Sequence, residues 1–164
     1  MSDIKRSDGN IEVFLLLGSN IHPEVNIPLA IKKLKEKMRV AIISSIWETR
    51  SDKISDPNFL NCIVKVITNL SLDEIKKEIV RPIEDQLYRV RTENKNAPRS
   101  IDIDIILYGD LEVDTTIWEH VYISVPLAEL RPNYVNKKNN QKLSDAAEKL
   151  KGRNFIIKRS DIKE

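Results

Sequence analysis

The sequence predicts an α+β fold, a ferredoxin-like βαββαβ sheet with helices packed on its faces. Two observations predict it: apolar runs of strand length alternate with stretches of helical periodicity, and two neighbouring strand-like runs stand between the two helical stretches. The chain has 164 residues, of which 41% are hydrophobic and 32% charged, an ordinary soluble composition. We therefore expect a flexible tail over residues 1–10, a single domain over residues 11–158 and a basic C-terminal tail over residues 159–164 that is a solvated end.

Each element has its own signal. Short apolar runs bounded by turn residues predict strands, and apolar residues three and four positions apart predict helices. In order, the expected elements are a strand over residues 11–17, a helix over 23–37, a strand over 40–47, a polar loop over 51–57, a strand over 59–68, a helix over 71–88 and a strand from residue 102.

The second helix and the C-terminal region carry further signals. Ser71 to Glu74 form a capping pattern that predicts the helix start, and Pro82 predicts a kink or a broken turn, since proline removes an intrahelical hydrogen bond. The last forty residues predict a short apolar strand, loops and an amphipathic helix near residues 143–150.

Two carboxylates lie two residues apart in the strand from residue 102. Side chains alternate along a strand, so Asp102 and Asp104 share a face with Cα atoms roughly 6.5 to 7 Å apart. We expect Ile106 and Tyr108 to continue this face, which leaves the acids near the rim of a buried surface. The other face is expected to carry Ile101, Ile103, Ile105 and Leu107.

This pattern is suited to a hard cation. Mg²⁺ prefers oxygen ligands and is commonly held by one or two carboxylates together with substrate phosphates. Arg99 would add a guanidinium fork for phosphate oxygens. The alternative is an edge strand whose polar face points at water. The cluster of Arg89, Arg91, Lys95 and Arg99 favours the cation site, because so local a group of charges suits a small polyanion better than a nucleic-acid duplex.

Composition excludes other classes of function. The net charge is +2 and aromatic residues make up 5%, so we expect no nucleic-acid partner. The longest apolar runs are strand-sized, so we expect no membrane span or secretory signal. The one cysteine, Cys62, cannot form an internal disulfide, and we expect core packing and a cytoplasmic location.

Five ordered motifs resemble the 6-hydroxymethyl-7,8-dihydropterin pyrophosphokinase family of folate biosynthesis. The resemblance runs from about Val13 to Gly109 and weakly onward to Pro132. The motifs are Leu17-Gly18-Ser19-Asn20; Ser44-Ser45 followed by Glu48-Thr49; Pro57-Asn58-Phe59-Leu60-Asn61; Ile83-Glu84 followed by Arg89-Val90-Arg91; and Pro98-Arg99-Ser100-Ile101-Asp102-Ile103-Asp104. The resemblance implies an enzyme that moves pyrophosphate from ATP to the pterin hydroxymethyl group and releases AMP.

The same resemblance implies roles for individual residues. Asp102 and Asp104 would bind two Mg²⁺ ions that bridge the ATP phosphates, with Asp104 also helping to accept the hydroxyl proton. Arg89 and Arg99 would act in catalysis on the phosphates. The expected ATP contacts are Glu84, Arg89, Arg91, Arg99, Ile105 and His120, and the expected pterin contacts are Thr49, Phe59, Asn61 and Tyr122.

The chain departs from the family after Thr49 and again after Gly109, among other positions. After Thr49 the family usually carries prolines and a glycine, whereas here Arg50 to Asp56 follow. The segment between Gly109 and Pro126 is also shorter, and two alignments stay open. Counting back from Pro126, Tyr122 replaces a stacking aromatic and His120 an arginine; counting forward, His120 matches the family's histidine.

Three functional hypotheses follow from these residues. The first is an active pyrophosphokinase, expected to be a monomer. The second is a diverged pyrophosphokinase that acts on a related pterin, and the third is a pterin-binding protein without catalysis. The retained pair of Asp102 and Asp104 favours the first, since a pterin binder has little use for two neighbouring acids that cost stability without a cation.

Overall fold

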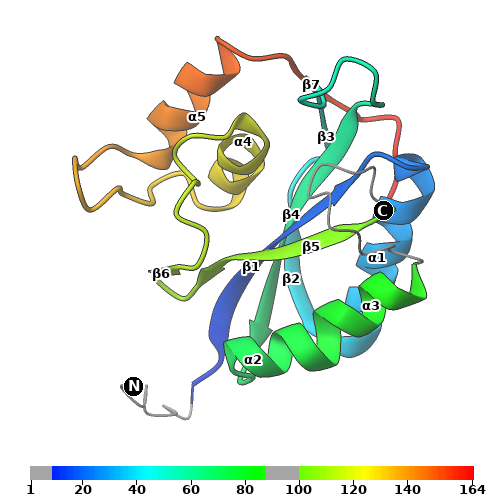
Figure 1. Cartoon of the computed structure of the whole chain (residues 1–164). Coiled ribbons are helices and arrows are strands. Elements are labelled where there is room, and N and C mark those ends of the chain that lie inside the picture. Colours follow the sequence, from blue (N-terminus) through cyan, green and yellow to red (C-terminus); the bar gives the residue numbers. More distant parts are fainter. Residues whose placement is uncertain (1–8, 88–99) are drawn as a thin grey trace.

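The computed structural model describes residues 9–87 and 100–164. Within them, seven strands form one sheet with helices on both faces (Figure 1). The elements are β1 (Ile11–Ser19), α1 (Pro23–Lys37), β2 (Arg39–Ile43), β3 (Trp47–Thr49), β4 (Phe59–Thr68), α2 (Leu72–Glu74), the π-helical segment η1 (Ile75–Val80), α3 (Arg81–Gln86), β5 (Asp102–Tyr108), β6 (Leu111–Glu112), α4 (Val121–Leu130), α5 (Leu143–Lys151) and β7 (Ile156–Lys158).

The predicted fold class is confirmed. The strand order is β6-β5-β1-β4-β3-β7, and β2 also pairs with β4. All of these pairings are antiparallel. The central order β5-β1-β4, with β2 and β3 together on the far side of β4, is that of a ferredoxin-like sheet.

The strand predicted over residues 40–47 is two strands, β2 and β3. Ser44 lies between them and is buried. Its hydroxyl accepts the N–H of Ile63 at 2.8 Å, while its own N–H donates to the Ile63 carbonyl at 2.9 Å. A side-chain oxygen thus replaces a backbone carbonyl in the ladder, which interrupts the strand without separating it from β4.

The second helical segment is irregular next to Pro82, as predicted from the sequence. Ser71 and Glu74 form the expected capping box, and η1 precedes Pro82. Arg81 donates its N–H to the Lys76 carbonyl, five residues back instead of four. Because Pro82 has no N–H to continue the α-helical pattern, a wide turn is accommodated here.

The apolar stretch at residues 121–130 is a helix, so the prediction of a short apolar strand before the last helix was wrong. The stretch contains β-branched residues, which favour strands. In the structure, however, Ile123 and Leu127 are buried against the sheet, while Val121 and Val125 pack with Trp47 and with Ala147 of α5. Burial on several sides outweighs the intrinsic preference. The short strand of this region is β7, which follows α5.

Two hydrophobic cores lie on opposite faces of the sheet. On one face, Val13, Leu15 and Leu17 of β1 pack with residues of α1, η1 and α3, and Cys62 lies in this core as expected. On the other face, Phe14 and Leu16 pack under α4 and α5. Figure 1 shows α1, α2 and α3 on one side of the sheet and α4 and α5 on the other.

The expected alternation along β5 fails at its end. Leu15 pairs with Ile105 and Phe14 with Leu107, so Ile106 is an extra residue in β5. This bulge places both Ile106 and Leu107 in the core under α4, while Tyr108 packs in the opposite core. The prediction that Leu107 shares a face with Ile105, and Tyr108 with the aspartates, was therefore wrong.

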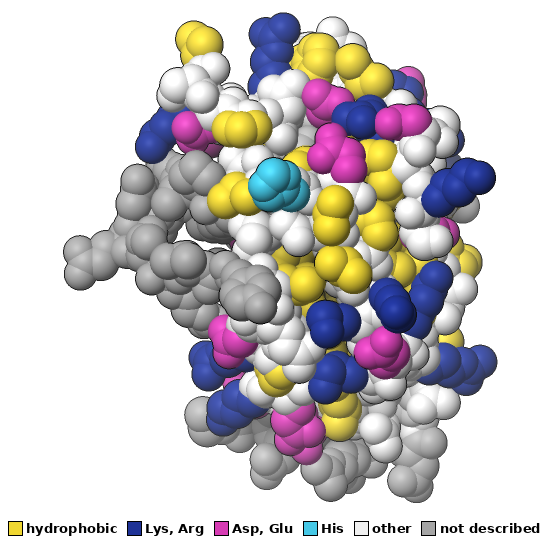
Figure 2. Space-filling view, turned by 90° about the vertical axis from the view of Figure 1, so that its right-hand side faces the viewer, with side chains coloured by type: hydrophobic (Ala, Val, Ile, Leu, Met, Phe, Trp, Pro, Cys, Tyr) yellow, Lys and Arg dark blue, Asp and Glu magenta, His cyan; other side chains and the backbone are white. Residues whose placement is uncertain are grey.

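The C-terminal residues are mostly exposed, but they are held to the sheet. β7 pairs with β3, the N–H of Arg159 donates to the Ile46 carbonyl at 2.9 Å, and Ile162 packs on the core of the α1 face. On the molecular face in Figure 2, basic side chains are interspersed with acidic and apolar ones. Among the described residues, no helix has the length and apolarity that crossing a membrane requires.

Candidate active site

Two polar side chains flank a glycine in one row across three neighbouring strands, on the α4 face of the sheet. Gly18 of β1 pairs with Asn61 of β4 on one side and with Asp102 of β5 on the other. Directly opposed residues of antiparallel strands share a face, so all three lie on the same side. A Cβ atom at Gly18 would come within 3.3 Å of Asn61 Oδ1. Because glycine has no side chain, position 18 adds no atoms between the Asn61 amide and the Asp102 carboxylate.

The two aspartates lie at the edge of the apolar core on this face. Asp102 is half-buried and Asp104 is exposed, and the next row across the sheet joins Asp104 to Leu16 and Leu16 to Ile63. Leu16 and Ile63 belong to the core under α4. The backbone therefore places both acids as expected, on one face at the rim of a buried surface.

The donor set fits magnesium better than a metal held by protein alone. Among residues 9–87 and 100–164, no three His, Cys, Asp or Glu side chains gather as a metal cage. Mg²⁺ does not need such a cage, because it retains waters and takes further oxygen ligands from substrate phosphates. Asp102 and Asp104, with the partial or full exposure they show, can supply the protein's share.

Glu84 reaches the outer edge of β5 from α3. Glu84 is 2% exposed, and its carboxylate accepts the N–H of Ile103, between the two aspartates, at 3.1 Å. Within the described parts of the chain, β6 pairs with Leu107 and Tyr108 and with no residue nearer to the aspartates. Glu84 therefore takes the place of a strand along this part of the described edge and fixes the backbone that carries the acids.

Ile105 contributes its backbone, not its side chain, to this region. The side chain is 6% exposed and lies in the core on the α1 face, away from the aspartates. No strand among the described residues pairs with the outer edge of β5 at Ile105. An ATP contact at this position would therefore involve main-chain groups.

The expected pterin residues of β3 and β4 come together. Thr49 pairs with Phe59 and Trp47 with Asn61, so all four side chains lie on the α4 face. Asn61, which is 4% exposed, donates from Nδ2 to Thr49 Oγ1 at 2.9 Å. This bond fixes the orientation of the amide. Phe59 is half-buried, which leaves part of its ring accessible.

His120 and Tyr122 form one unit at the start of α4. Their rings stack with centroids 5.0 Å apart and planes 18° apart, and both side chains are half-buried. Val121, between them, packs with Trp47 of β3. Tyr122 packs against the core under α4. His120, which both alignments involve, is therefore joined through the stack to the ring that one of them assigns to the pterin.

Ser19, the last residue of β1, and Asn20, the first residue after it, contact the segments that precede two other strands. The Ser19 hydroxyl donates to the Ser100 carbonyl at 2.5 Å, just before β5, and Asn20 Nδ2 donates to the Pro57 carbonyl at 3.5 Å, just before β4. Both side chains are buried. These two residues thus tie together the beginnings of the two strands that carry the candidate residues. The signal was the short polar run directly after a buried strand.

Arg89, Arg91 and Arg99 lie outside the described residues, as does Lys95. Their expected roles on the phosphates stay predictions. The described part of the site consists of the two carboxylates, the amide and hydroxyl pair, the buried glutamate and the stacked rings.

Comparison with known proteins identifies the family. The family model of 7,8-dihydro-6-hydroxymethylpterin-pyrophosphokinase (HPPK) matches residues 14–132, which include nearly all of β1, and β4, β5 and both aspartates. The chain belongs to the HPPK family. The resemblance read from the motifs is thereby confirmed, and its match extends through α4.

Individual HPPK relatives differ in length. The 2-amino-4-hydroxy-6-hydroxymethyldihydropteridine pyrophosphokinase of Aquifex aeolicus is 33% identical over 134 residues, which cover 76% of this chain and 82% of the relative. Folic acid synthesis protein FOL1 of Dictyostelium discoideum is 32% identical over 138 residues, which cover 78% of this chain but 21% of that protein. The present chain thus spans about a fifth of the longer relative.

Solved structures agree on the HPPK fold. An HPPK-DHPS structure from Plasmodium falciparum superposes with a TM-score of 0.70 at 13% identity, and the match covers 93% of this chain and 48% of that one. At this identity the likeness concerns the fold alone.

Proposed function

We propose that this chain transfers pyrophosphate from ATP to the hydroxymethyl group of 6-hydroxymethyl-7,8-dihydropterin, releasing AMP, in folate biosynthesis. The observation that carries the proposal is the row Asn61, Gly18 and Asp102, in a chain of this family. It sets a group able to read a heterocycle edge beside a group able to hold a phosphate-bound cation. The hydroxymethyl oxygen would bond to the β-phosphorus as the bond from that phosphorus to the α,β-bridging oxygen breaks.

Asp102 and Asp104 are the residues that would hold magnesium, with two ions expected. When bound, Mg²⁺ supplies neutralisation of phosphate charge and alignment of the transferred group. The protein's own part is positional: the Glu84 bond to Ile103 and the Ser19 bond to Ser100 fix the strand from which both carboxylates project. We assign Asp104, the more exposed acid, as the acceptor of the hydroxyl proton.

Asn61, Thr49, Phe59 and Tyr122 are the proposed pterin contacts. An amide has donors and an acceptor, so Asn61 can match the mixed polar edge of a pterin once Thr49 has fixed its orientation. The partly accessible rings of Phe59 and Tyr122 offer flat apolar surfaces. His120 and the backbone of Ile105 are the proposed ATP contacts, together with Glu84, Arg89, Arg91 and Arg99.

Catalysis by this site would rest on positioning and electrostatics, without a covalent enzyme intermediate. We expect the chain to act as a cytoplasmic monomer without nucleic-acid or membrane partners.

The first experiment is an AMP assay. Purified protein is incubated with Mg-ATP and 6-hydroxymethyl-7,8-dihydropterin, AMP is followed by chromatography, and pterin is omitted in the control. We expect AMP that depends on pterin. Pterin binding without AMP would contradict the proposal and favour a changed substrate or a binding-only protein.

A further inference from the structure

The loop between β3 and β4, residues 50–58, joins two of the proposed pterin contacts. Thr49 precedes the loop and Phe59 follows it, and the two residues pair across the strands. The first seven residues of the loop, 50–56, lack the prolines and glycine that the family resemblance leads one to expect after Thr49. The loop has a backbone hydrogen bond of its own, from the Asp56 N–H to the Lys53 carbonyl at 3.0 Å. In addition, the C-terminal segment, residues 155–161, contacts the first residue of the loop directly and the last residue through Glu48.

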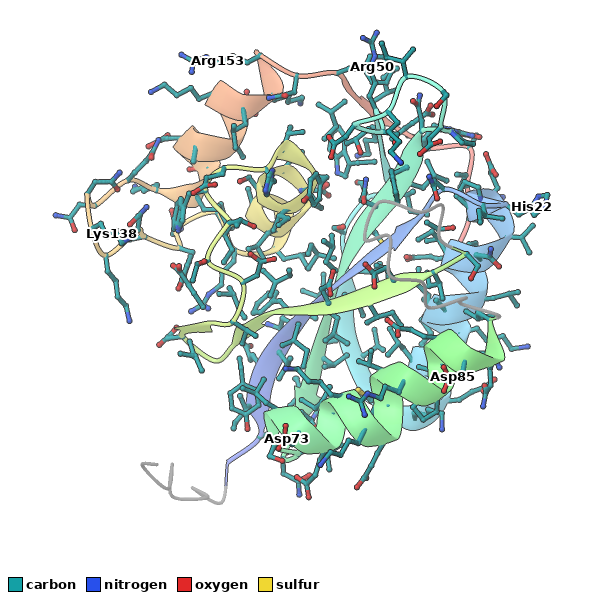
Figure 3. The ribbon with its side chains drawn as sticks, viewed as in Figure 1. His22, Arg50, Asp73, Asp85, Lys138 and Arg153 are labelled. Atoms are coloured by element: carbon teal, nitrogen blue, oxygen red, sulfur yellow. The ribbon has the colours of Figure 1, made fainter. Side chains whose placement is uncertain are left out.

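At its first residue, the loop rests on the residue before β7. The guanidinium carbon of Arg50 lies 4.8 Å from the ring centroid of Phe155. Cation–π contacts of this kind are attractive even at exposed sites. Figure 3 shows Arg50 in the loop that follows β3, at the top of the molecule beside the C-terminal segment.

At its last residue, the loop is held through Glu48. Asn58 Nδ2 donates to Glu48 Oε1 at 2.8 Å, and Arg159 Nη1 donates to Glu48 Oε2 at 2.8 Å. The carboxylate of Glu48 thus bridges the end of the loop and the residue that follows β7. Charge-assisted hydrogen bonds of this length are among the stronger ones in proteins.

Arg159 is itself fixed in orientation. Asp161 accepts from both Nε and Nη2 at 2.8 Å, which leaves Nη1 directed at Glu48. Glu24 of α1 adds a weaker ion pair at 3.9 Å. The backbone N–H of Arg159 also donates to the Ile46 carbonyl, and β7 pairs with β3, the strand that carries Thr49. The C-terminal segment is therefore connected both to β3 and, through Glu48, to the last residue of the loop.

We propose that residues 155–161 brace the β3–β4 loop and thereby fix Thr49 and Phe59 for pterin binding, with Arg159 and Glu48 as positioning residues. The inference rests on the proposed function for the identity of the ligand. It assigns a role in substrate positioning to a segment beyond the part of the chain that the family model matches, which ends at residue 132.

The test compares Arg159, within the segment, with Arg153, which precedes it. Arg159→Gln removes the bond to Glu48, whereas the matched control Arg153→Gln makes the same change at an exposed arginine after α5 (Figure 3). We expect Arg159→Gln to raise the pterin dissociation constant, measured by fluorescence titration, about tenfold, the order expected for losing one charge-assisted hydrogen bond. The Michaelis constant of Arg159→Gln for ATP should stay near the wild-type value, as should the pterin dissociation constant of the control Arg153→Gln. Arg159→Lys should recover part of the pterin affinity.

A second readout needs no ligand. Lys53 lies within the loop, so trypsin reports on loop opening. We expect Arg159→Gln to be cleaved after Lys53 faster than Arg153→Gln under native conditions. If Arg159→Gln does not fold, Glu48→Gln removes the same ion pair from the other side and gives the same expected results.

The outcomes separate this inference from the proposed function. Unchanged pterin affinity and unchanged cleavage in folded Arg159→Gln would overturn the brace while wild-type turnover stands. An equal loss of pterin and ATP affinity would also overturn it, because that result indicates a general structural role. A wild-type chain that neither binds pterin nor releases AMP would overturn the proposed function and, with it, the ligand part of the inference.

Discussion

At the residue scale, the proposed chemistry depends most directly on the two aspartates of β5. Exchanging carboxylate for amide keeps the shape of the side chain and removes the charge. We expect Asp102→Asn and Asp104→Asn each to lower kcat at least about a hundredfold, since an electrostatic group aimed at the reacting phosphates is lost. Pterin affinity should change little, because Asn61 and Thr49 stay in place. Steady-state AMP release and pterin titration measure the two effects, and turnover retained in both variants would refute the metal assignment.

The same strand, together with β4, shows which side-chain positions can be predicted from the sequence pattern and which cannot. Strand alternation was enough to place Asp102 with Asp104, and Phe59 with Asn61, because each pair lies in a regular part of its ladder. It was not enough for Leu107, because one extra residue in β5 reverses the alternation. Nothing in an isoleucine-rich run indicates a bulge. Contacts such as Glu84 with Ile103 depend on how helix and sheet pack, which sequence spacing does not contain.

At the element scale, the connection of β3, the loop and β7 has a pH dependence that can be measured. The Asn58 hydrogen bond, together with Arg159, lowers the pKa of Glu48 below its ordinary value near 4.5, and Arg159 lowers the pKa of Asp161 to about 2. A carboxylate with a lowered pKa in the folded state contributes stability above its ordinary pKa. That contribution is lost as the pH falls through the lowered value.

We therefore expect the melting temperature of the wild-type protein to fall more steeply than that of Arg159→Gln as the pH is lowered from about 6 to about 2, since the variant has already lost the arginine bonds. Arg153→Gln should follow the wild type. Differential scanning calorimetry across this range gives the comparison. Parallel curves for wild type and Arg159→Gln would mean that these bonds contribute no net stability.

Helix and strand assignments succeeded where local and tertiary preferences agree. α1 has one apolar stripe and α5 has an amphipathic sequence, and both were predicted. α4 was not, because it is apolar on several sides and rich in β-branched residues, and only its position between the sheet and α5 makes it helical. The strand order of the central sheet was predictable because few topologies connect two strand pairs through two helices.

At the scale of the whole molecule, the sheet separates two cores that are buried by different parts of the chain. The helices that cover the α1 face lie before residue 87, and those that cover the α4 face lie after residue 120. The sequence predicts one domain over residues 11–158, and this arrangement makes the prediction testable. β1 contributes to both cores, with Leu15 and Leu17 on one face and Phe14 and Leu16 on the other, so loss of either core should be transmitted through it.

Two truncations test this coupling. Leu34 of α1 and Leu127 of α4 are both 0% exposed, and replacing either by alanine should lower the free energy of unfolding by about 2 to 5 kcal/mol. If the chain is one cooperative domain, the opening free energy that native-state hydrogen exchange gives for the most protected amides should fall by the same amount on both faces in each variant. Lys149→Ala, an exposed change on α5, should leave protection near wild type. A loss of protection confined to α4 and α5 in Leu127→Ala would instead show that the C-terminal layer opens independently of the sheet.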